Sequence, residues 1–239
     1  MKRISKQMSE TIELGIVLAL SGGFMDAYSY MCRDHVFANA QTGNILLFGV
    51  NLSQGNWGTA LHYLGPILAF IVGLALSDLF RLIRRGTERL HWRQVTVALE
   101  AIVLFIVSFL PQSMNLLGNS LTSLACGLQV ESFRKIHGNG IATTMCIGNL
   151  RSATQNLCEF LRTKNTEFAR KSGLYFFTIL CFTVGAIFGN LAVGLWAEKA
   201  ILCASLLLVV AFCMMFVDFE RESREVHERL VEDEEQREI

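Results

Sequence analysis

The chain has 239 residues, 52% of them hydrophobic, and a mean hydropathy of +0.40. This composition excludes an ordinary soluble domain with a polar surface. The formal net charge is zero because 21 basic residues balance 21 acidic ones, yet the charges are concentrated in a few segments. Three stretches contain no Asp, Glu, Lys or Arg, namely 36–77, 101–130 and 172–197. Since about 20 apolar residues cross the hydrocarbon core of a bilayer, these stretches predict a membrane protein.

Six apolar segments predict an all-α, polytopic membrane helix bundle. The spans are expected at 12–33, 62–82, 94–110, 113–133, 173–196 and 200–218. Tight turns at Pro111-Gln112-Ser113 and at Glu198-Lys199 separate the third span from the fourth and the fifth from the sixth. The first apolar run contains an acid and leads into a repeated segment, so we expect it to be retained rather than cleaved as a signal.

The placement of lysine and arginine predicts that both termini are cytoplasmic. With the N-terminus inside, 19 of the 21 basic residues fall in inner segments, and Arg33 and Lys199 alone fall outside. Cytoplasmic loops of membrane proteins carry such an excess of basic residues. We therefore expect a multi-pass membrane protein with both termini in the cytoplasm.

Two parts of the chain resemble each other at an offset of 105 residues. The offset pairs Gly22 with Gly127, Asp26 with Glu131, Tyr28 with Phe133, and Gly43-Asn44 with Gly148-Asn149. Because each copy holds three spans, the second copy must lie inverted in the membrane, which is a recurring plan in secondary transporters. The expected units are a first three-span repeat over 1–111, a second, inverted repeat over 112–218, and a charged cytoplasmic tail over 219–239.

Each repeat also contains an apolar segment that does not span. Residues 45–52 are too short to cross, and they predict a re-entrant or interfacial half-helix that begins near Thr42. The equivalent segment begins near Gly148, and apolar residues at helical spacing over 150–161 predict an amphipathic helix at the cytoplasmic face. The alternative for both segments is a surface loop with a short helix and no chemistry.

A Gly-Asp pattern near the end of the first span, followed 16 residues later by Thr-Gly-Asn, resembles the YoaK-like family of small bacterial multi-pass membrane proteins. The residues that carry the likeness are Gly22, Gly23, Asp26, Thr42, Gly43 and Asn44, supported by Gly127, Gln129, Gly148 and Asn149. The likeness extends over residues 12–218, although the second copy has Ile147 in place of the threonine. The resemblance implies a location in the bacterial inner membrane and a multi-pass topology. It brings no established substrate or catalytic residues.

Asp26 is the strongest candidate for a substrate or ion pathway. An ionisable residue inside a span is costly and usually faces an interior, a cavity or a partner. It would suit a proton carrier; the alternative is a structural group that pairs with Arg33 or with tyrosines. Glu131 is a second candidate, although an ion pair with neighbouring bases is favoured there. Glu100 is expected to reach the cytoplasmic face or to pair with an inner arginine.

Other polar or backbone-exposing positions complete the predicted pathway, namely Gln129, Thr42, Gly43, Asn44, Gly148 and Asn149. Small residues at four-residue spacing form two stripes, Gly65, Ala69 and Gly73 in the second span and Gly185 and Gly189 in the fifth. Such stripes let helices approach closely, and they predict packing within the chain or in a homodimer.

The function predicted first is a secondary transporter or permease for a small solute, with proton coupling through Asp26. The alternative is a non-transporting membrane module that assembles with or regulates a partner. A polar cavity where the acids and the Gly-Asn turns meet would favour the transporter, and a solid apolar core would favour the module.

We expect no enzyme, because no nucleophile motif or phosphate-binding loop is present. Seven cysteines without a CxxC pair, and histidines without ligand spacing, predict no metal site or disulfide. No cofactor and no nucleic acid are expected, and the bilayer is the surrounding partner.

Overall fold

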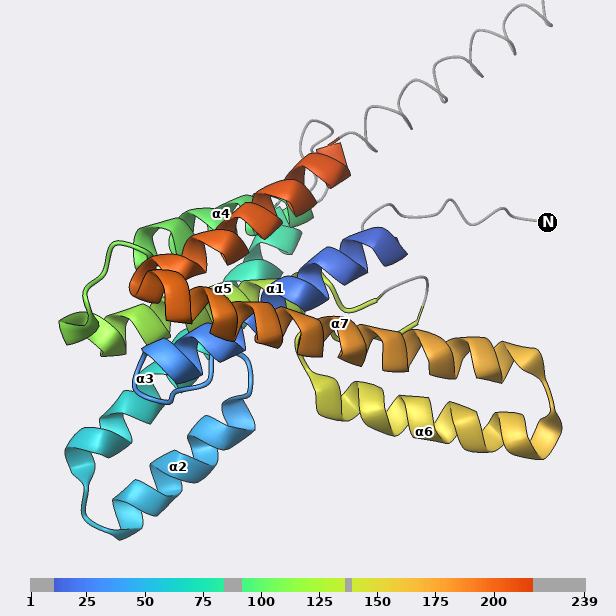
Figure 1. Cartoon of the computed structure of the whole chain (residues 1–239), viewed down its shortest axis with the longest axis horizontal. Coiled ribbons are helices and arrows are strands. Elements are labelled where there is room, and N and C mark those ends of the chain that lie inside the picture. Colours follow the sequence, from blue (N-terminus) through green and yellow to red (C-terminus); the bar gives the residue numbers. More distant parts are fainter. Residues whose placement is uncertain (1–10, 84–91, 136–138, 217–239) are drawn as a thin grey trace, which may run out of the picture.

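The computed structural model describes residues 11–83, 92–135 and 139–216, and over these ranges the chain is all-α (Figure 1). The predicted tail over 219–239 lies outside the described residues. The helices are α1 Ile12–Cys32, α2 Gln41–Ser53, α3 Trp57–Ile83, α4 Trp92–Val107, α5 Asn115–Ser132, α6 Cys146–Thr163 and α7 Thr166–Trp196. Two short 3-10 turns, η2 Gln112–Met114 and η3 Ala197–Ala200, lie between them, and residues 201–216 form a further helix.

Three helical stretches of the described chain are long and apolar enough to cross a membrane, namely Ile12–Cys32, Trp57–Ile83 and Thr166–Phe216. The third is divided at Ala197, whose φ of 47° ends α7, and the chain then reverses direction (Figure 1). It therefore covers both the fifth and the sixth predicted spans. The third and fourth predicted spans coincide with α4 and α5, which do not reach the length and apolarity of a membrane span.

The polarity of α5 has a physical reason. Most of this helix is buried among other helices, and its buried side chains include Asn119, Thr122, Ser123 and Gln129. A helix that is enclosed by protein does not face lipid, so its polar groups need partners but not an apolar surround. By contrast, large apolar side chains are exposed along α3, α7 and residues 201–216. Exposed apolar faces of this extent are typical of a membrane surface.

Two pairs of helices touch through their backbones where glycines remove the side chains. A methyl group on Gly23 of α1 would collide with the carbonyl oxygen of Phe182 in α7, and one on Gly127 of α5 would collide with that of Phe70 in α3. Gly185 lies in the same way against Leu20. These contacts leave no room for a side chain, so they fix α1 against α7 and α3 against α5.

The residues of the two predicted stripes lie along the same helix pairs. Added methyl groups on Gly65 and Gly189 would lie 2.8 Å from Leu116 Cδ1 and from the Phe24 carbonyl oxygen. Gly73 approaches the backbone of α5, and Ala69 is half-buried on the same helix. Within the single chain, these small residues therefore lie at helix contacts.

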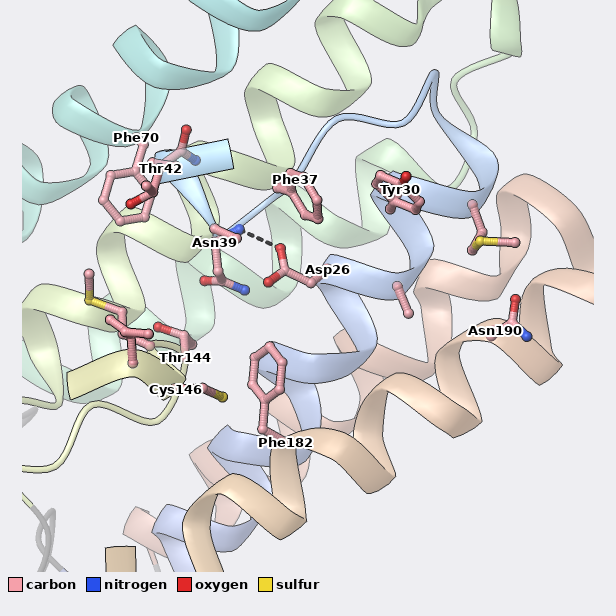
Figure 2. Close-up of a pocket in the computed structure, with 16 residues that line it drawn as sticks. Asp26, Tyr30, Phe37, Asn39, Thr42, Phe70, Thr144, Cys146, Phe182 and Asn190 are labelled. Atoms are coloured by element: carbon pink, nitrogen blue, oxygen red, sulfur yellow. Dashed lines mark hydrogen bonds between the residues drawn. The ribbon is translucent and has the colours of Figure 1, made fainter. Parts of the chain in front are cut away.

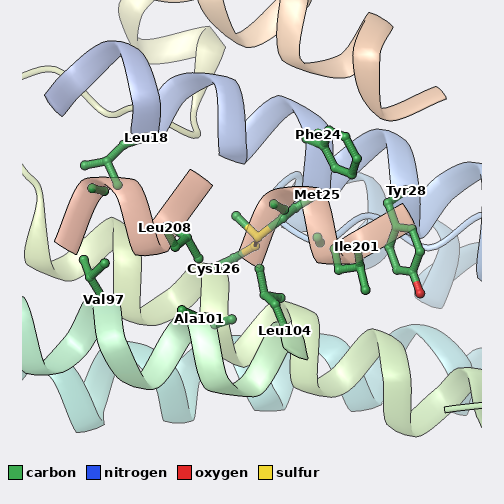
Figure 3. Packing of buried hydrophobic residues seen from close by; sticks show 14 of the residues in the cluster. Leu18, Phe24, Met25, Tyr28, Val97, Ala101, Leu104, Cys126, Ile201 and Leu208 are labelled. Atoms are coloured by element: carbon green, nitrogen blue, oxygen red, sulfur yellow. Dashed lines mark hydrogen bonds between the residues drawn. The ribbon is translucent and has the colours of Figure 1, made fainter. Parts of the chain in front are cut away.

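The apolar core lies where α1, α4, α5 and residues 201–216 meet (Figure 3). The 201–216 helix buries Ile201, Ala204, Leu208, Ala211 and Met215, a spacing of three and four residues that keeps one stripe inside. Met25 of α1 contacts Cys126 of α5 at 3.8 Å between their sulfur atoms. This cluster joins the first half of the chain to the second.

Arg33 follows α1 and is fully buried. Its guanidinium donates to the carbonyl oxygens of Val107, Leu110 and Pro111 at 3.2, 2.7 and 3.1 Å. It also donates to the Asn115 side chain at 3.1 Å and to the Tyr28 hydroxyl at 2.9 Å. These carbonyls end α4, where a helix leaves acceptors without partners and favours positive charge. Arg33 therefore ties the end of α1 to the turn between α4 and α5.

Replacing Gly23 with alanine should destabilise the protein, because the added methyl group has no space beside the Phe182 backbone. We expect the free energy of unfolding to fall by about 1–3 kcal/mol or more. The matched control is Gly49→Ala in α2, where nothing lies within 4 Å. That change should be neutral or stabilising by roughly 0.5–1 kcal/mol. Denaturant unfolding of both variants in detergent measures the difference, and equal losses would contradict the close α1–α7 contact.

Replacing Arg33 with methionine should cost on the order of 3–5 kcal/mol, because several buried carbonyl oxygens lose their donors. Arg33→Lys should fall between this variant and the wild type, since an ammonium group cannot reproduce the planar set of donors. Arg162→Met removes an exposed pair with Glu159 and serves as the control that should not change stability. Thermal unfolding of the purified variants measures their order of stability. An Arg33→Met protein as stable as the wild type would contradict the structural role of Arg33.

Candidate functional site

A cavity of about 720 Å³ opens between α1, α3, α7 and the two loops that precede α2 and α6 (Figure 2). Its lining includes Asp26, Tyr30, Phe37, Asn39, Gln41, Thr42, Phe70, Thr144, Met145, Cys146, Ile147, Phe182 and Asn190. Specific ligand sites commonly enclose about 300–1,000 Å³, with apolar walls and a few polar groups. The cavity fits both criteria, and segments far apart in the sequence build it.

Asp26 lies at the cavity wall, at the level where the first loop passes α1 (Figure 2). Its carboxylate accepts a hydrogen bond of 2.7 Å from the backbone N–H of Asn39, and the amides of Ala38 and Ala40 lie beside it. No ion pair joins Asp26 to a base among the described residues, so the predicted alternative of a pair with Arg33 is wrong. The acid instead attaches the loop to α1.

Asn39 brings an unused acceptor to the same place. The side-chain amide nitrogen donates to the carbonyl oxygen of Gly22 at 3.1 Å, which closes the loop against α1. The side-chain oxygen is buried and has no hydrogen-bond partner among the described residues, and the residue is only 2% exposed. A buried polar atom without a partner is uncommon, and one explanation is a bound group that donates to it. Asn39 lines the cavity, so its side-chain oxygen is a candidate acceptor for a ligand there.

The two loops are fixed by the same device. Asn44 of α2 accepts from the Phe37 N–H at 3.0 Å and donates to the Phe37 carbonyl at 2.7 Å. Asn149 of α6 accepts from the Ala142 N–H at 3.3 Å and donates to the Ala142 carbonyl at 2.6 Å. Each asparagine thus holds the backbone seven residues before it. These two residues position the loops, and they do not line the cavity.

The two loops give the cavity different chemistry. The first loop contributes the polar side chains of Asn39, Gln41 and Thr42, while the second contributes Thr144, Met145, Cys146 and Ile147. Aromatic rings complete the lining, and the rings of Tyr30 and Phe37 are stacked with their centroids 4.9 Å apart. The first loop, together with Asp26, is therefore the more polar side of the cavity, and the second loop is the more apolar one.

The other predicted pathway residues lie near the loops but outside the lining. Gly43 lies against the Phe37 ring, and Gly148 has open space around it. Gln129 is buried and donates to the Leu18 carbonyl at 3.0 Å and to the Thr143 hydroxyl at 3.1 Å, so it holds the second loop beside α1. Of the predicted pathway residues, Asp26 and Thr42 reach the cavity themselves.

Glu131 lies away from the cavity. Its carboxylate contacts Arg134 and lies 3.9 Å from an Arg81 nitrogen, which agrees with the favoured ion-pair interpretation. Gly127 and Gly23 each lie against a phenylalanine carbonyl, so the contacts favour an offset of 104 residues between the two predicted copies in place of 105. With that offset Asp26 is aligned with Val130 and not with Glu131.

Glu100 does not reach the cytoplasmic face as the sequence predicts. It is fully buried in α4, and neither carboxylate oxygen has a hydrogen-bond partner in the part of the chain that the structure describes. Cys126 lies close enough to interact electrostatically with both Glu100 and Asp26. A second acid is thus enclosed in the core.

Sequence reasoning missed Asn39, Phe70 and Phe182 as cavity residues. Asn39 carries no signal of its own, although the offset of 105 residues pairs it with Thr144, which also lines the cavity. The two phenylalanines each lie three residues before a glycine of a predicted stripe. Among the described residues no group of three or more histidine, cysteine or acidic side chains gathers to hold a metal ion.

Comparison with known proteins gives a relative and a family. The UPF0700 transmembrane protein YoaK of Bacillus subtilis (strain 168) is 28% identical over 187 residues, which cover 74% of this chain and 81% of the relative. The relative's name and the apolar helices together support a membrane protein. No solved structure matches the chain. The family model described as a protein of unknown function (DUF1275) matches residues 14–214, and the chain belongs to that family, as its YoaK-like motifs imply.

Proposed function

We propose that this protein is a secondary transporter or permease that carries a small solute across the bacterial inner membrane. The observation that carries the proposal is the cavity of about 720 Å³ at the junction of the two halves of the chain, with Asp26 in its wall. The alternative of a non-transporting module that assembles with or regulates a partner would fit a solid apolar core, and the cavity argues against it. No enzymatic step and no cofactor are part of the proposal.

We further propose that the chain has six spans in two inverted repeats. Contacts that recur in the two halves support this arrangement. Gly23 meets the Phe182 carbonyl as Gly127 meets the Phe70 carbonyl, so the first helix of each half packs on the long helix of the other. A two-fold axis in the membrane plane exchanges partners in this way. Two further features recur in the two halves. Asn44 and Asn149 each hold the loop before their helix, and the helices α1 to α4 have counterparts in the same order in α5, α6, α7 and residues 201–216.

The cavity lies where the two repeats meet. Five equivalent pairs of positions line it, namely Asn39 and Thr144, Ala40 and Met145, Gln41 and Cys146, Thr42 and Ile147, and Phe70 and Phe182. In transporters with inverted repeats the solute site lies at the repeat interface and is formed by interrupted helices. Loops inside a membrane are tolerated where they line a cavity, which fits the loops that precede α2 and α6.

The charge of the Asp26 side chain is linked to the position of the loop that precedes α2. Its carboxylate holds the first loop through the Asn39 N–H, and a hydrogen bond to an ionised acceptor is roughly twice as strong as a neutral one. Neutralising the carboxylate, by a proton or by a bound cation, weakens this contact and frees the loop to move. In the proposed cycle, this release changes the side from which the cavity is open.

The six-span topology makes a direct prediction. Reporter fusions after Leu110 and after Ala197 should report an external location, because both positions lie at turns that carry few basic residues. Fusions after Lys164 and after Ile239 should report a cytoplasmic location. An external signal at Lys164 would contradict the inverted repeat, and the fusion after Ile239 tests the position of the C-terminus independently.

Replacing Asp26 with asparagine should leave the fold intact and remove the pH dependence of transport. Asparagine keeps an acceptor for the Asn39 N–H but cannot ionise, so the thermal midpoint should change little. Solutes are found first by a thermal-shift screen of the purified wild type, since any ligand of the folded state stabilises it. Uptake into proteoliposomes is then measured between acidic and neutral pH.

The control for this variant is Glu159→Gln, which removes one negative charge from an exposed pair on α6. It should retain the uptake and its pH dependence. If Asp26→Asn protein is stable and its uptake still varies with pH as in the wild type, the coupling role is wrong. If it fails to fold, Asp26 is a structural residue.

A further inference from the structure

We infer that the cavity accepts an organic ammonium ion, a protonated amine attached to an apolar body. The inference rests on the proposed function, because it names the class of solute for the same cavity. It follows from the charge, the hydrogen-bonding groups and the apolar walls of the lining, each of which narrows the chemistry of the ligand.

The charge of the lining selects a cation. Asp26 is the one residue with a formal charge among those that line the cavity, and no ion pair joins it to a base in the described chain. A carboxylate at an apolar wall attracts a positive ligand and repels an anion, and both effects grow as water is excluded. An anionic solute would meet no positive side chain in this lining.

The hydrogen-bonding groups select a cation that donates. The Asn39 side-chain oxygen is buried and has no hydrogen-bond partner among the described residues. The Asp26 carboxylate accepts from the backbone N–H of the same residue, and the Asn39 side-chain amide turns its nitrogen, not its oxygen, toward that carboxylate (Figure 2). An ammonium group carries several donors for acceptors of this kind, whereas a quaternary ammonium has none. The unpaired acceptor therefore favours a primary or secondary amine over a fully alkylated one.

The remaining walls select an organic body over a metal ion. Calcium and magnesium take six or more oxygen ligands, or keep several waters, and this lining is mostly carbon and sulfur. Phe37, Phe70 and Phe182 present aromatic rings, and Met145 and Ile147 present apolar side chains. Aromatic faces attract cations, and the apolar side chains remove a hydrocarbon body from water.

Equilibrium binding to the purified full chain tests the inference with four probes of matched shape. Phenylethylammonium carries the charge and the N–H donors, and its trimethylated form carries the charge alone. Phenylethyl alcohol is the neutral probe, and phenylacetate is the anion. We expect the ammonium to bind most tightly, the trimethylated cation and the alcohol more weakly, and the anion least. Calorimetry and thermal shift provide two independent readouts.

Three variants locate the bound cation. Asp26→Asn should weaken binding of the ammonium by about 10- to 100-fold, the size expected for loss of a charged hydrogen bond. Phe182→Leu should weaken binding of the ammonium by roughly 3- to 10-fold, because the ring face attracts charge. Binding of the alcohol should be nearly unchanged. Glu159→Gln, which removes an exposed carboxylate from α6, should change neither probe.

Changing the lipid composition tests whether the bound amine is a free solute or a lipid headgroup. The same chemistry is present in a free amine and in the aminoethyl headgroup of phosphatidylethanolamine. Protein in nanodiscs of phosphatidylglycerol alone is compared with protein in nanodiscs that also contain phosphatidylethanolamine. If phenylethylammonium binds more weakly in the second preparation, and if Asp26→Asn removes this difference between the preparations, the cavity binds the lipid headgroup. If binding is equal in the two preparations, the cavity binds free amines.

The outcomes separate this inference from the proposed function. Tighter binding of the alcohol or the anion than of the ammonium overturns the cation class, while uptake of such a solute into proteoliposomes would keep the transporter. Ammonium binding without uptake would support the cation site and overturn transport. Failure of all four probes to bind the folded protein overturns the inference, and uptake of solutes from the thermal-shift screen then decides the proposed function separately.

Discussion

The backbone contacts between α1 and α7 and between α3 and α5 determine the rest of the structure. They exist because Gly23, Gly185, Gly73 and Gly127 have no side chains, so a carbonyl oxygen of one helix can lie directly against the glycine backbone of the other. Within a bilayer, lipid is as apolar as the helices, and such close packing is a main source of association. The contacts bring the loops before α2 and α6 together on one side of α1. The cavity is what remains between them.

The helical pattern could be predicted from the sequence because it depends on local apolar runs and on turns. The spans around α1, α3 and α7, the turn at Ala197 and the half-helix that begins at Gln41 all follow from such signals. The environment of α5 could not be predicted in this way, because the sequence predicts an ordinary span at 113–133 and does not show what surrounds its polar side chains. Their partners lie in α1 and in the second loop, far away in the sequence.

The candidate site was predicted in part for a similar reason. Asp26 stands out because a single acid within an apolar run is uncommon. Glu131 stands out equally, but the structure gives it basic neighbours across a turn of helix and from α3, and a one-residue shift of register separates it from the Asp26 position. Asn39 carries no such signal, since an asparagine in an uncharged loop gains its importance from the carboxylate it meets.

The burial of Arg33 also bears on the order in which the protein can be assembled. The residue is synthesised 74 positions before the first carbonyl that it binds, and its other partners on this side follow within a few residues of that one. Until α4 and α5 are in place, the Tyr28 hydroxyl is the acceptor that α1 itself offers, and the other donors of the guanidinium must remain with water or lipid headgroups. Docking of α5 is therefore the step that withdraws the charge from water. A chain that stops short of this step carries an exposed cation at the end of its first helix.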